Sequence, residues 1–213
     1  MALGHTELLF GQGRRNYATW STVNKSNNVV LSGGNLTWAW TAGGGFGSGI
    51  ATIGKSSDKW LWEVFINSVG TDGSVVRFGI ANFIPTSANT TVLGQSGSVS
   101  SIGWRGSPWA YSLNNNGTTS TVGSPGTAYA ANQYYLVAMD MDNKTLTIYR
   151  DGTLVMNAVA IPSAGSATWY PACSSPNASG SVSTANFGQL AWSSVNETAR
   201  NTLVAAGYKL GVY

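Results

Sequence analysis

Carboxylates are the side chains of this sequence best suited to acid–base chemistry, and they are few. The three glutamates are Glu7, Glu63 and Glu197. A retaining glycosidase needs two carboxyl groups about 5 Å apart, one as nucleophile and one as acid. Retaining β-sandwich enzymes carry them on one strand as Glu-x-Asp-x-x-Glu. None of the three glutamates has that spacing, so the sequence carries no intact motif of this class.

Asp140 and Asp142 are the only close pair of carboxylates. Two residues apart on a strand, they face the same side. There they could share a proton or, with Asn143, hold a calcium ion, which takes oxygen ligands. The plainer interpretation is that Asp142 and Asn143 stabilise a turn between two strands. We therefore expect no bound metal.

Nucleophilic catalysis lacks its partner residues. The only histidine, His5, lies close to the N-terminus, so no Ser-His-Asp or Cys-His arrangement is expected in the folded part. The single cysteine, Cys173, stands among apolar residues and is expected to be an inert core thiol. The glycine-rich segment 43–49 lacks the Lys-Ser/Thr pair of a phosphate-binding loop. The sequence predicts a protein that is not an enzyme and needs no cofactor.

Residue types that favour binding gather at Arg105, Trp109 and Tyr111. Arginine and aromatic side chains dominate the energetics of protein interfaces, and aromatic faces also stack on sugars. The opposing interpretation is that the nine tryptophans mostly fill the core. We take Arg105, Trp109 and Tyr111 as candidate binding residues for a protein or a glycan, on loops held by a rigid scaffold.

Residues 1–13 are predicted to form an N-terminal arm. Leu8, Leu9 and Phe10 make a short apolar run, and Gly11-Gln-Gly13 interrupts any regular element after it. A disordered tail is one interpretation, because most termini are poorly ordered. A docking peptide for a neighbouring subunit is the other, because an apolar triplet left in water would be unusual. Both remain open at this stage.

Composition and charge exclude several partner classes. Only 9% of the 213 residues are charged, against about 25% in an ordinary soluble domain. Such a low charge content is common in assembly subunits and extracellular adhesins. The net charge is +3 and the only basic doublet is Arg14-Arg15, whereas nucleic-acid binding needs clustered cations. No signal peptide and no apolar stretch of ~20 residues is apparent. We expect no nucleic-acid or membrane partner, and folding in a cytoplasm.

Alternation with period two marks the strands. In residues 60–66 both faces are largely apolar, which indicates a strand inside a layered structure. The side chains that share one face are those of Trp60, Trp62, Val64 and Ile66. Asp151-Gly152 supplies the positive φ angles of a two-residue hairpin. With turn residues about every ten positions, residues 14–213 are predicted to form one all-β domain, an antiparallel two-sheet sandwich.

One short helix is predicted near the C-terminus. Ser194 and Glu197 match a capping box, and Gly207 supplies a stop signal. The apolar stripe of this helix consists of Val195, Ala199 and Leu203.

Six motifs in one order resemble the SPRY (B30.2-like) domain of the concanavalin-type jelly roll. They lie at residues 51–60, 78–81, 101–111, 137–152, 170–172 and 185–188. The most specific is Asp140-Met-Asp142-Asn-Lys-Thr-Leu-Thr-Ile-Tyr-Arg-Asp-Gly152, similar to the family's Asp-x-Asp-Asn-x-Thr-Leu-x-Phe-x-x-Asn-Gly, with Asp151 where the family usually has Asn. The resemblance covers roughly residues 46–190. It implies a non-catalytic sandwich with Trp104 and Tyr111 near buried positions.

The charge-poor style rich in Ser, Thr, Asn and Gly, with Gly207-Tyr-Lys209 near the end, is similar to SPRY proteins encoded among bacteriophage structural genes. That likeness implies a virion component, in capsid decoration or a tail fibre, whose partners are other virion proteins, copies of itself, and a host-surface glycan or protein. Two alternatives stay open: a carbohydrate-binding adhesin module and a free cytoplasmic adaptor that binds peptides.

Overall fold

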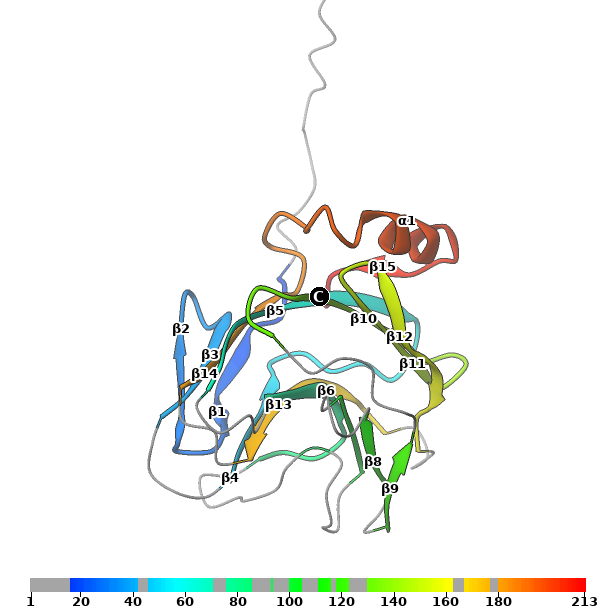
Figure 1. Cartoon of the computed structure of the whole chain (residues 1–213). Coiled ribbons are helices and arrows are strands. Elements are labelled where there is room, and N and C mark those ends of the chain that lie inside the picture. Colours follow the sequence, from blue (N-terminus) through cyan, green and yellow to red (C-terminus); the bar gives the residue numbers. More distant parts are fainter. Residues whose placement is uncertain are drawn as a thin grey trace, which may run out of the picture.

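The structure is a computed structural model that describes residues 16–41, 46–70, 76–85, 93, 100–104, 111–115, 118–122, 130–162, 167–176 and 180–213. Within these ranges the chain forms fifteen strands and one helix. Two sheets with antiparallel neighbours pack face to face, and the helix lies outside them (Figure 1). The predicted all-β sandwich with one short C-terminal helix is confirmed.

The first sheet, sheet A, has seven strands in the order β1-β4-β13-β6-β7-β8-β9. Their bounds are β1 Trp20–Lys25, β4 Phe46–Ala51, β13 Tyr170–Pro176, β6 Arg77–Ala81, β7 Ser101–Trp104, β8 Tyr111–Asn115 and β9 Thr118–Val122. Segments far apart in sequence, such as β4, β13 and β6, are therefore direct neighbours.

The second sheet, sheet B, has the order β12-β11-β10-β5-β14-β3-β2. Their bounds are β12 Thr153–Ala160, β11 Thr145–Arg150, β10 Tyr134–Asp140, β5 Lys59–Val69, β14 Ser181–Asn186, β3 Thr37–Trp40 and β2 Val29–Ser32. The short strand β15 (Lys209–Leu210) runs parallel to the start of β5, beyond the end of its pairing with β14. Helix α1 (Glu197–Ala205) covers part of the outer face of this sheet (Figure 1).

Alternation along β5 places the tryptophans in the core as predicted. Trp60, Trp62, Val64 and Ile66 all belong to the buried cluster between the sheets. The neighbouring strand β10 contributes to the same cluster. Its Val137 stands opposite Trp62 and is buried with it. Cys173 is also completely buried there, as predicted, and burial raises the pKa of its thiol to about 12, which favours the protonated form.

The hairpin between β11 and β12 turns at Asp151 and Gly152, with φ angles of 47° and 79°. Both values are positive, as the sequence predicted. Asp-Gly tolerates this geometry because glycine has no Cβ and aspartate adopts the left-handed region more readily than most residues.

The turn between β10 and β11 is organised by Asp140. Its carboxylate accepts hydrogen bonds from the backbone of Asp142 at 3.1 Å and from the backbone and side-chain amides of Asn143 at 2.8 and 2.9 Å. Lys59 forms an ion pair with it at 3.3 Å. Burial by itself raises the pKa of Asp140, but the Asn143 hydrogen bonds and Lys59 together hold it below its usual value. The described residues contain no group of three His, Cys, Asp or Glu side chains that could hold a metal.

The start of helix α1 differs from the prediction. It begins at Glu197 with Asn196 at the N-cap position and no side-chain cap, so Ser194 does not form a capping box. The Asn196 side chain is instead committed to the sheet, where its Oδ1 accepts the Gly152 backbone N–H at 2.8 Å. Val195 precedes the helix and is 50% exposed, whereas Ala199 and Leu203 are buried as predicted. No helix of the described residues is long and apolar enough to span a membrane.

Position 79 in β6 requires glycine, because the backbone of β7 approaches it closely. A Cβ at this position would lie 2.0 Å from the backbone oxygen of Ile102. Gly79→Ala is therefore expected to push the two strands apart and to lower the free energy of unfolding by about 2 kcal/mol, as over-packing does. Urea denaturation followed by circular dichroism measures this change.

The matched control is Gly49→Ala, in β4 of the same sheet. A Cβ at Gly49 would meet its nearest neighbour, Nε1 of Trp38, at 3.4 Å, an ordinary contact. This variant is expected to keep the stability of the parent. Equal losses in the two variants would show that the β6–β7 approach is not what requires glycine.

Candidate functional site

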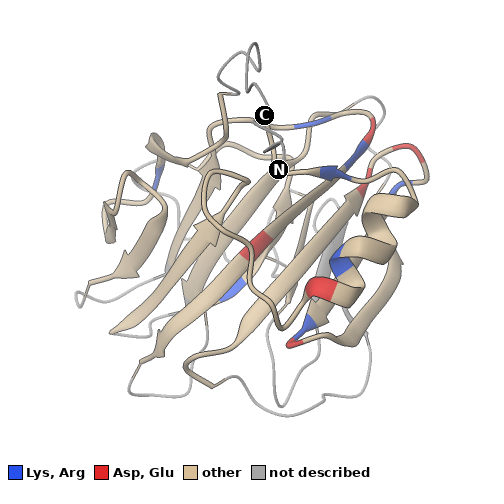
Figure 2. Cartoon of the chain, turned by 90° about the horizontal axis from the view of Figure 1, so that it is seen from above, with Lys and Arg blue, Asp and Glu red and all other residues tan. Residues whose placement is uncertain are grey.

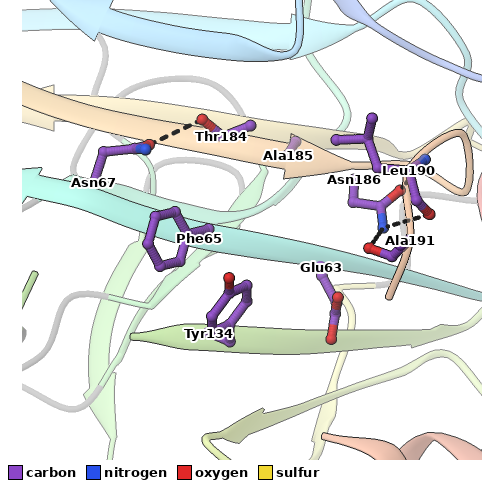
Figure 3. Close-up of a pocket in the computed structure, with 9 residues that line it drawn as sticks. All are labelled: Glu63, Phe65, Asn67, Tyr134, Thr184, Ala185, Asn186, Leu190 and Ala191. Carbon is purple, nitrogen blue, oxygen red and sulfur yellow. Dashed lines mark hydrogen bonds between the residues drawn. The ribbon is translucent and has the colours of Figure 1, made fainter. Parts of the chain in front are cut away.

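A pocket of about 250 Å³ opens on sheet B (Figure 3). It lies on the outer face of the sheet, because Glu63, Phe65 and Asn67 alternate along β5 with the core residues of the same strand. Its walls come from β5, β10, β14 and the loop that follows β14. The lining residues are Glu63, Phe65, Asn67, Tyr134, Thr184, Ala185, Asn186, Leu190 and Ala191. We call this the outer pocket.

Two aromatic side chains form the apolar part of the outer pocket. Phe65 of β5 and Tyr134 of β10 stand directly opposite each other in the register of the two strands. Their ring centroids lie 4.5 Å apart with the planes tilted by 37°, a cross-strand aromatic pair. Both rings are partly exposed. They therefore offer a preformed apolar contact surface rather than core packing.

A short chain of hydrogen bonds orients the polar side of the pocket. Thr184 donates its hydroxyl to Oδ1 of Asn67 at 2.9 Å (Figure 3). The hydroxyls of Thr37 and Thr184 are 3.0 Å apart. Because Oδ1 of Asn67 accepts this bond, the amide group of this exposed residue is held in one orientation and can donate outward.

The loop at residues 188–191 is pinned by the buried side chain of Asn186. Its Nδ2 donates to the backbone oxygens of Leu190 and Ala191 at 3.1 and 3.2 Å. Its Oδ1 accepts the backbone N–H groups of Gly188 and Leu190 at 2.9 and 3.1 Å. This arrangement fixes Leu190, which is 46% exposed, at the rim of the pocket.

Glu63 lies at the base of the pocket and is only 3% exposed. Its carboxylate accepts the Ser193 backbone N–H at 2.9 Å and the Ser193 hydroxyl at 2.5 Å. The side-chain amide of Asn196 donates to it at 3.2 Å. Glu63 therefore anchors the segment before α1, and among the described residues that line the pocket it is the one carboxylate.

The surface beside the outer pocket carries little charge. Strands β14, β3 and β2 contain no Lys, Arg, Asp or Glu. Viewed from above, these strands are uniformly tan, while charged residues gather around α1 and the adjoining turns (Figure 2). Because these three strands carry no charged side chain of their own, a ligand extending over them would be recognised mainly through shape, apolar contact and neutral hydrogen bonds.

The structure does not place most of the binding residues predicted from the sequence. Arg105 and Trp109 fall outside the described residues, as do Leu8, Leu9 and Phe10 of the arm. Tyr111 begins β8 opposite Trp104, which is buried as the resemblance implied. These residues remain candidate binding residues.

The outer pocket was not predicted from the sequence. The apolar second face of residues 60–66 was the available signal for Phe65. Nothing local placed Tyr134 opposite that ring or brought residues 186–191 over the same strand.

A family model for the SPRY domain matches residues 59–190. This range includes β5, β10 and β14, the three strands that line the outer pocket. The chain belongs to the SPRY domain family. No curated protein matches it.

Solved structures agree on the fold. The SPRY domain of human HERC1 superposes with a TM-score of 0.57 at 17% identity, covering 81% of this chain and 99% of that one. The PSpry domain of TRIM65 gives 0.57 at 15% identity, covering 79% and 89%. SPRY domains are typically non-catalytic modules that bind proteins, and that class applies to this chain. At these identities the solved structures support the sandwich and not a particular partner.

Proposed function

We propose that this SPRY chain is a non-catalytic module that binds a short segment of a partner protein at the outer pocket. The observation that carries the proposal is the partly exposed Phe65–Tyr134 pair, set beside an oriented Asn67 amide. At about 250 Å³ the pocket is smaller than a typical small-molecule site of roughly 300–1,000 Å³. It suits one or two apolar anchor side chains of a peptide.

Rigidity of the walls supports this function. The Asn186 bonds to the 188–191 loop and the Thr184 bond to Asn67 hold the rim in place before a ligand arrives. Binding then loses little conformational entropy in the protein, which leaves more of the contact energy as affinity. The ligand's apolar anchors would lie on the aromatic pair, and its backbone oxygens would accept from the Asn67 amide.

The low charge of the chain also bears on where the module works. We propose a virion component, in capsid decoration or a tail fibre, because the 9% charged composition and the uncharged strands β14, β3 and β2 suit a surface covered by neighbouring subunits. The free peptide-binding adaptor is equally compatible with a SPRY domain. A glycan-binding adhesin would use the same aromatic pair for sugar stacking.

Leu190→Asp tests the pocket, because it places a charge at the apolar rim. Peptides selected from a random display library against the full chain are expected to bind Leu190→Asp at least tenfold more weakly than the parent, by isothermal titration. If the setting is right, co-sedimentation with purified particles weakens in parallel.

Leu154→Asp on edge strand β12 is the matched control. Leu154 is 45% exposed, against 46% for Leu190, and does not line the pocket. It should leave peptide affinity unchanged. Selected peptides that tolerate Leu190→Asp, or that are lost equally in both variants, would place the binding site elsewhere.

A further inference from the structure

The described chain begins against one wall of the outer pocket. Nε2 of Gln189 donates to the backbone oxygen of Ala18 at 3.0 Å. The ring of Tyr17 lies so close to Gly188 that a Cβ there would be 2.4 Å from it. Gln189 directly precedes Leu190, the apolar residue at the pocket rim. The chain therefore enters the sandwich beside the loop that forms the rim.

The apolar triplet Leu8-Leu9-Phe10 is joined to this entry point by a short connection. Phe10 precedes Asn16, the first described residue, by six positions. Such a connection spans about 20 Å when fully extended and about 13 Å on average when flexible. Gly11 and Gly13 allow the backbone to reverse direction. The reach is sufficient for the triplet to return to a pocket whose rim adjoins Ala18.

The chemistry of the triplet matches the pocket. Leu8, Leu9 and Phe10 are uncharged and apolar, as are Phe65, the ring of Tyr134, and Leu190. The triplet would remove from water the exposed parts of these three side chains. A space of about 250 Å³ takes one or two of its side chains. The carboxylate of Glu63 at the base already accepts hydrogen bonds from Ser193 and Asn196, so burying it further under an apolar side chain costs less than burying an unpaired charge.

We propose that Leu8-Leu9-Phe10 occupies the outer pocket of its own chain. This inference rests on the proposed function, in that the pocket binds a protein segment, and it names the segment. Tethering favours the same chain, because a short flexible link gives an effective concentration in the millimolar range. The arm is then a built-in competitor that a partner segment displaces.

The first test uses a fluorescein-labelled peptide of residues 1–15 and fluorescence anisotropy. The receptor is the full chain carrying Leu8→Ser, Leu9→Ser and Phe10→Ser, whose pocket is vacated. The peptide is expected to bind this receptor at least tenfold more tightly than the parent chain, which carries its own competitor. Adding Leu190→Asp to the receptor should abolish binding, and adding Leu154→Asp should not.

Failure of this inference is distinguishable from failure of the proposed function. If library-selected peptides bind the triple-serine chain through Leu190 while the 1–15 peptide does not compete, the pocket functions and the arm is not its occupant. If no peptide of either kind binds, both proposals fall. Equal binding of the 1–15 peptide to parent and triple-serine chains would overturn occupation by the tethered arm.

A second test separates the chain's own arm from that of another copy. Cys173 is fully buried, so an engineered Leu9→Cys, Leu190→Cys pair faces no competing exposed thiol among the described residues. Oxidation is expected to give a disulfide-linked monomer on a non-reducing gel, with one thiol left after denaturation. A disulfide-linked dimer would assign the pocket to the arm of a second copy. Three remaining thiols would show that the triplet does not reach the rim, and either result overturns the proposal.

Discussion

Trp62→Ala is expected to lower the free energy of unfolding by about 3–5 kcal/mol. Trp62 is 1% exposed in β5, with β10 on one side and β14 on the other. Removing the indole opens a large cavity between the sheets, where neighbouring side chains cannot collapse without breaking strand pairing. Against a typical stability of about 5–15 kcal/mol, a loss of this size leaves the chain unfolded or barely folded near 37 °C. Urea denaturation followed by circular dichroism measures it.

Trp62→Phe is the informative comparison for this variant. It keeps an aromatic ring and removes less volume, so its stability should lie between those of the parent and Trp62→Ala. A soluble Trp62→Ala protein with the parent's denaturation midpoint would contradict the assignment of Trp62 to the core.

Features governed by neighbouring residues were predictable from the sequence. Asp151-Gly152 determines a turn because the two residues adopt positive φ at low cost, whatever the rest of the fold does. The inward side of β5 followed from alternation, because a strand turns successive side chains to opposite faces. The motifs of the SPRY resemblance combine such local rules, and for that reason they identified the sandwich before its strands could be paired.

The helix start shows where local rules fail. Ser194 and Glu197 have the right spacing for a capping box, but Asn196 is bound to Glu63 and to Gly152. These contacts join residues 133 and 44 positions apart in sequence. Tertiary bonds of this kind outweigh a cap worth about 1 kcal/mol, and no single-segment pattern contains them.

The outer pocket was unpredictable for the same reason. Phe65 and Tyr134 are separated by most of sheet A in the chain, and their pairing exists only because β5 and β10 are neighbours. Leu190 reaches the rim only because Asn186 holds the loop after β14. A sequence pattern could mark Phe65 as an apolar residue on an outward face, but it could not supply the partners that make a site.

Glu63→Ala is expected to release the C-terminal segment from sheet B and to cost about 3 kcal/mol of unfolding free energy. The variant leaves three donors without their acceptor, the two of Ser193 in a partly buried place and that of Asn196 in a buried one. Each such group costs about 1–3 kcal/mol unless water reaches it. Hydrogen exchange should show residues 187–205 losing protection before β10 and β11 do, because Glu63 joins this segment to the sheet.

Glu197→Ala, a Glu→Ala change at an exposed residue in the first turn of α1, is the matched control and should cost less than about 1 kcal/mol. Glu63→Gln, which keeps one acceptor oxygen, should fall between the two. Because the same segment carries Leu190, a loosened Glu63→Ala chain should also bind pocket peptides more weakly while Glu197→Ala binds them normally. Equal stability of Glu63→Ala and Glu197→Ala would mean that the helix is held by the apolar contacts of Ala199 and Leu203 alone, and that the buried carboxylate contributes nothing to the pocket's rigidity.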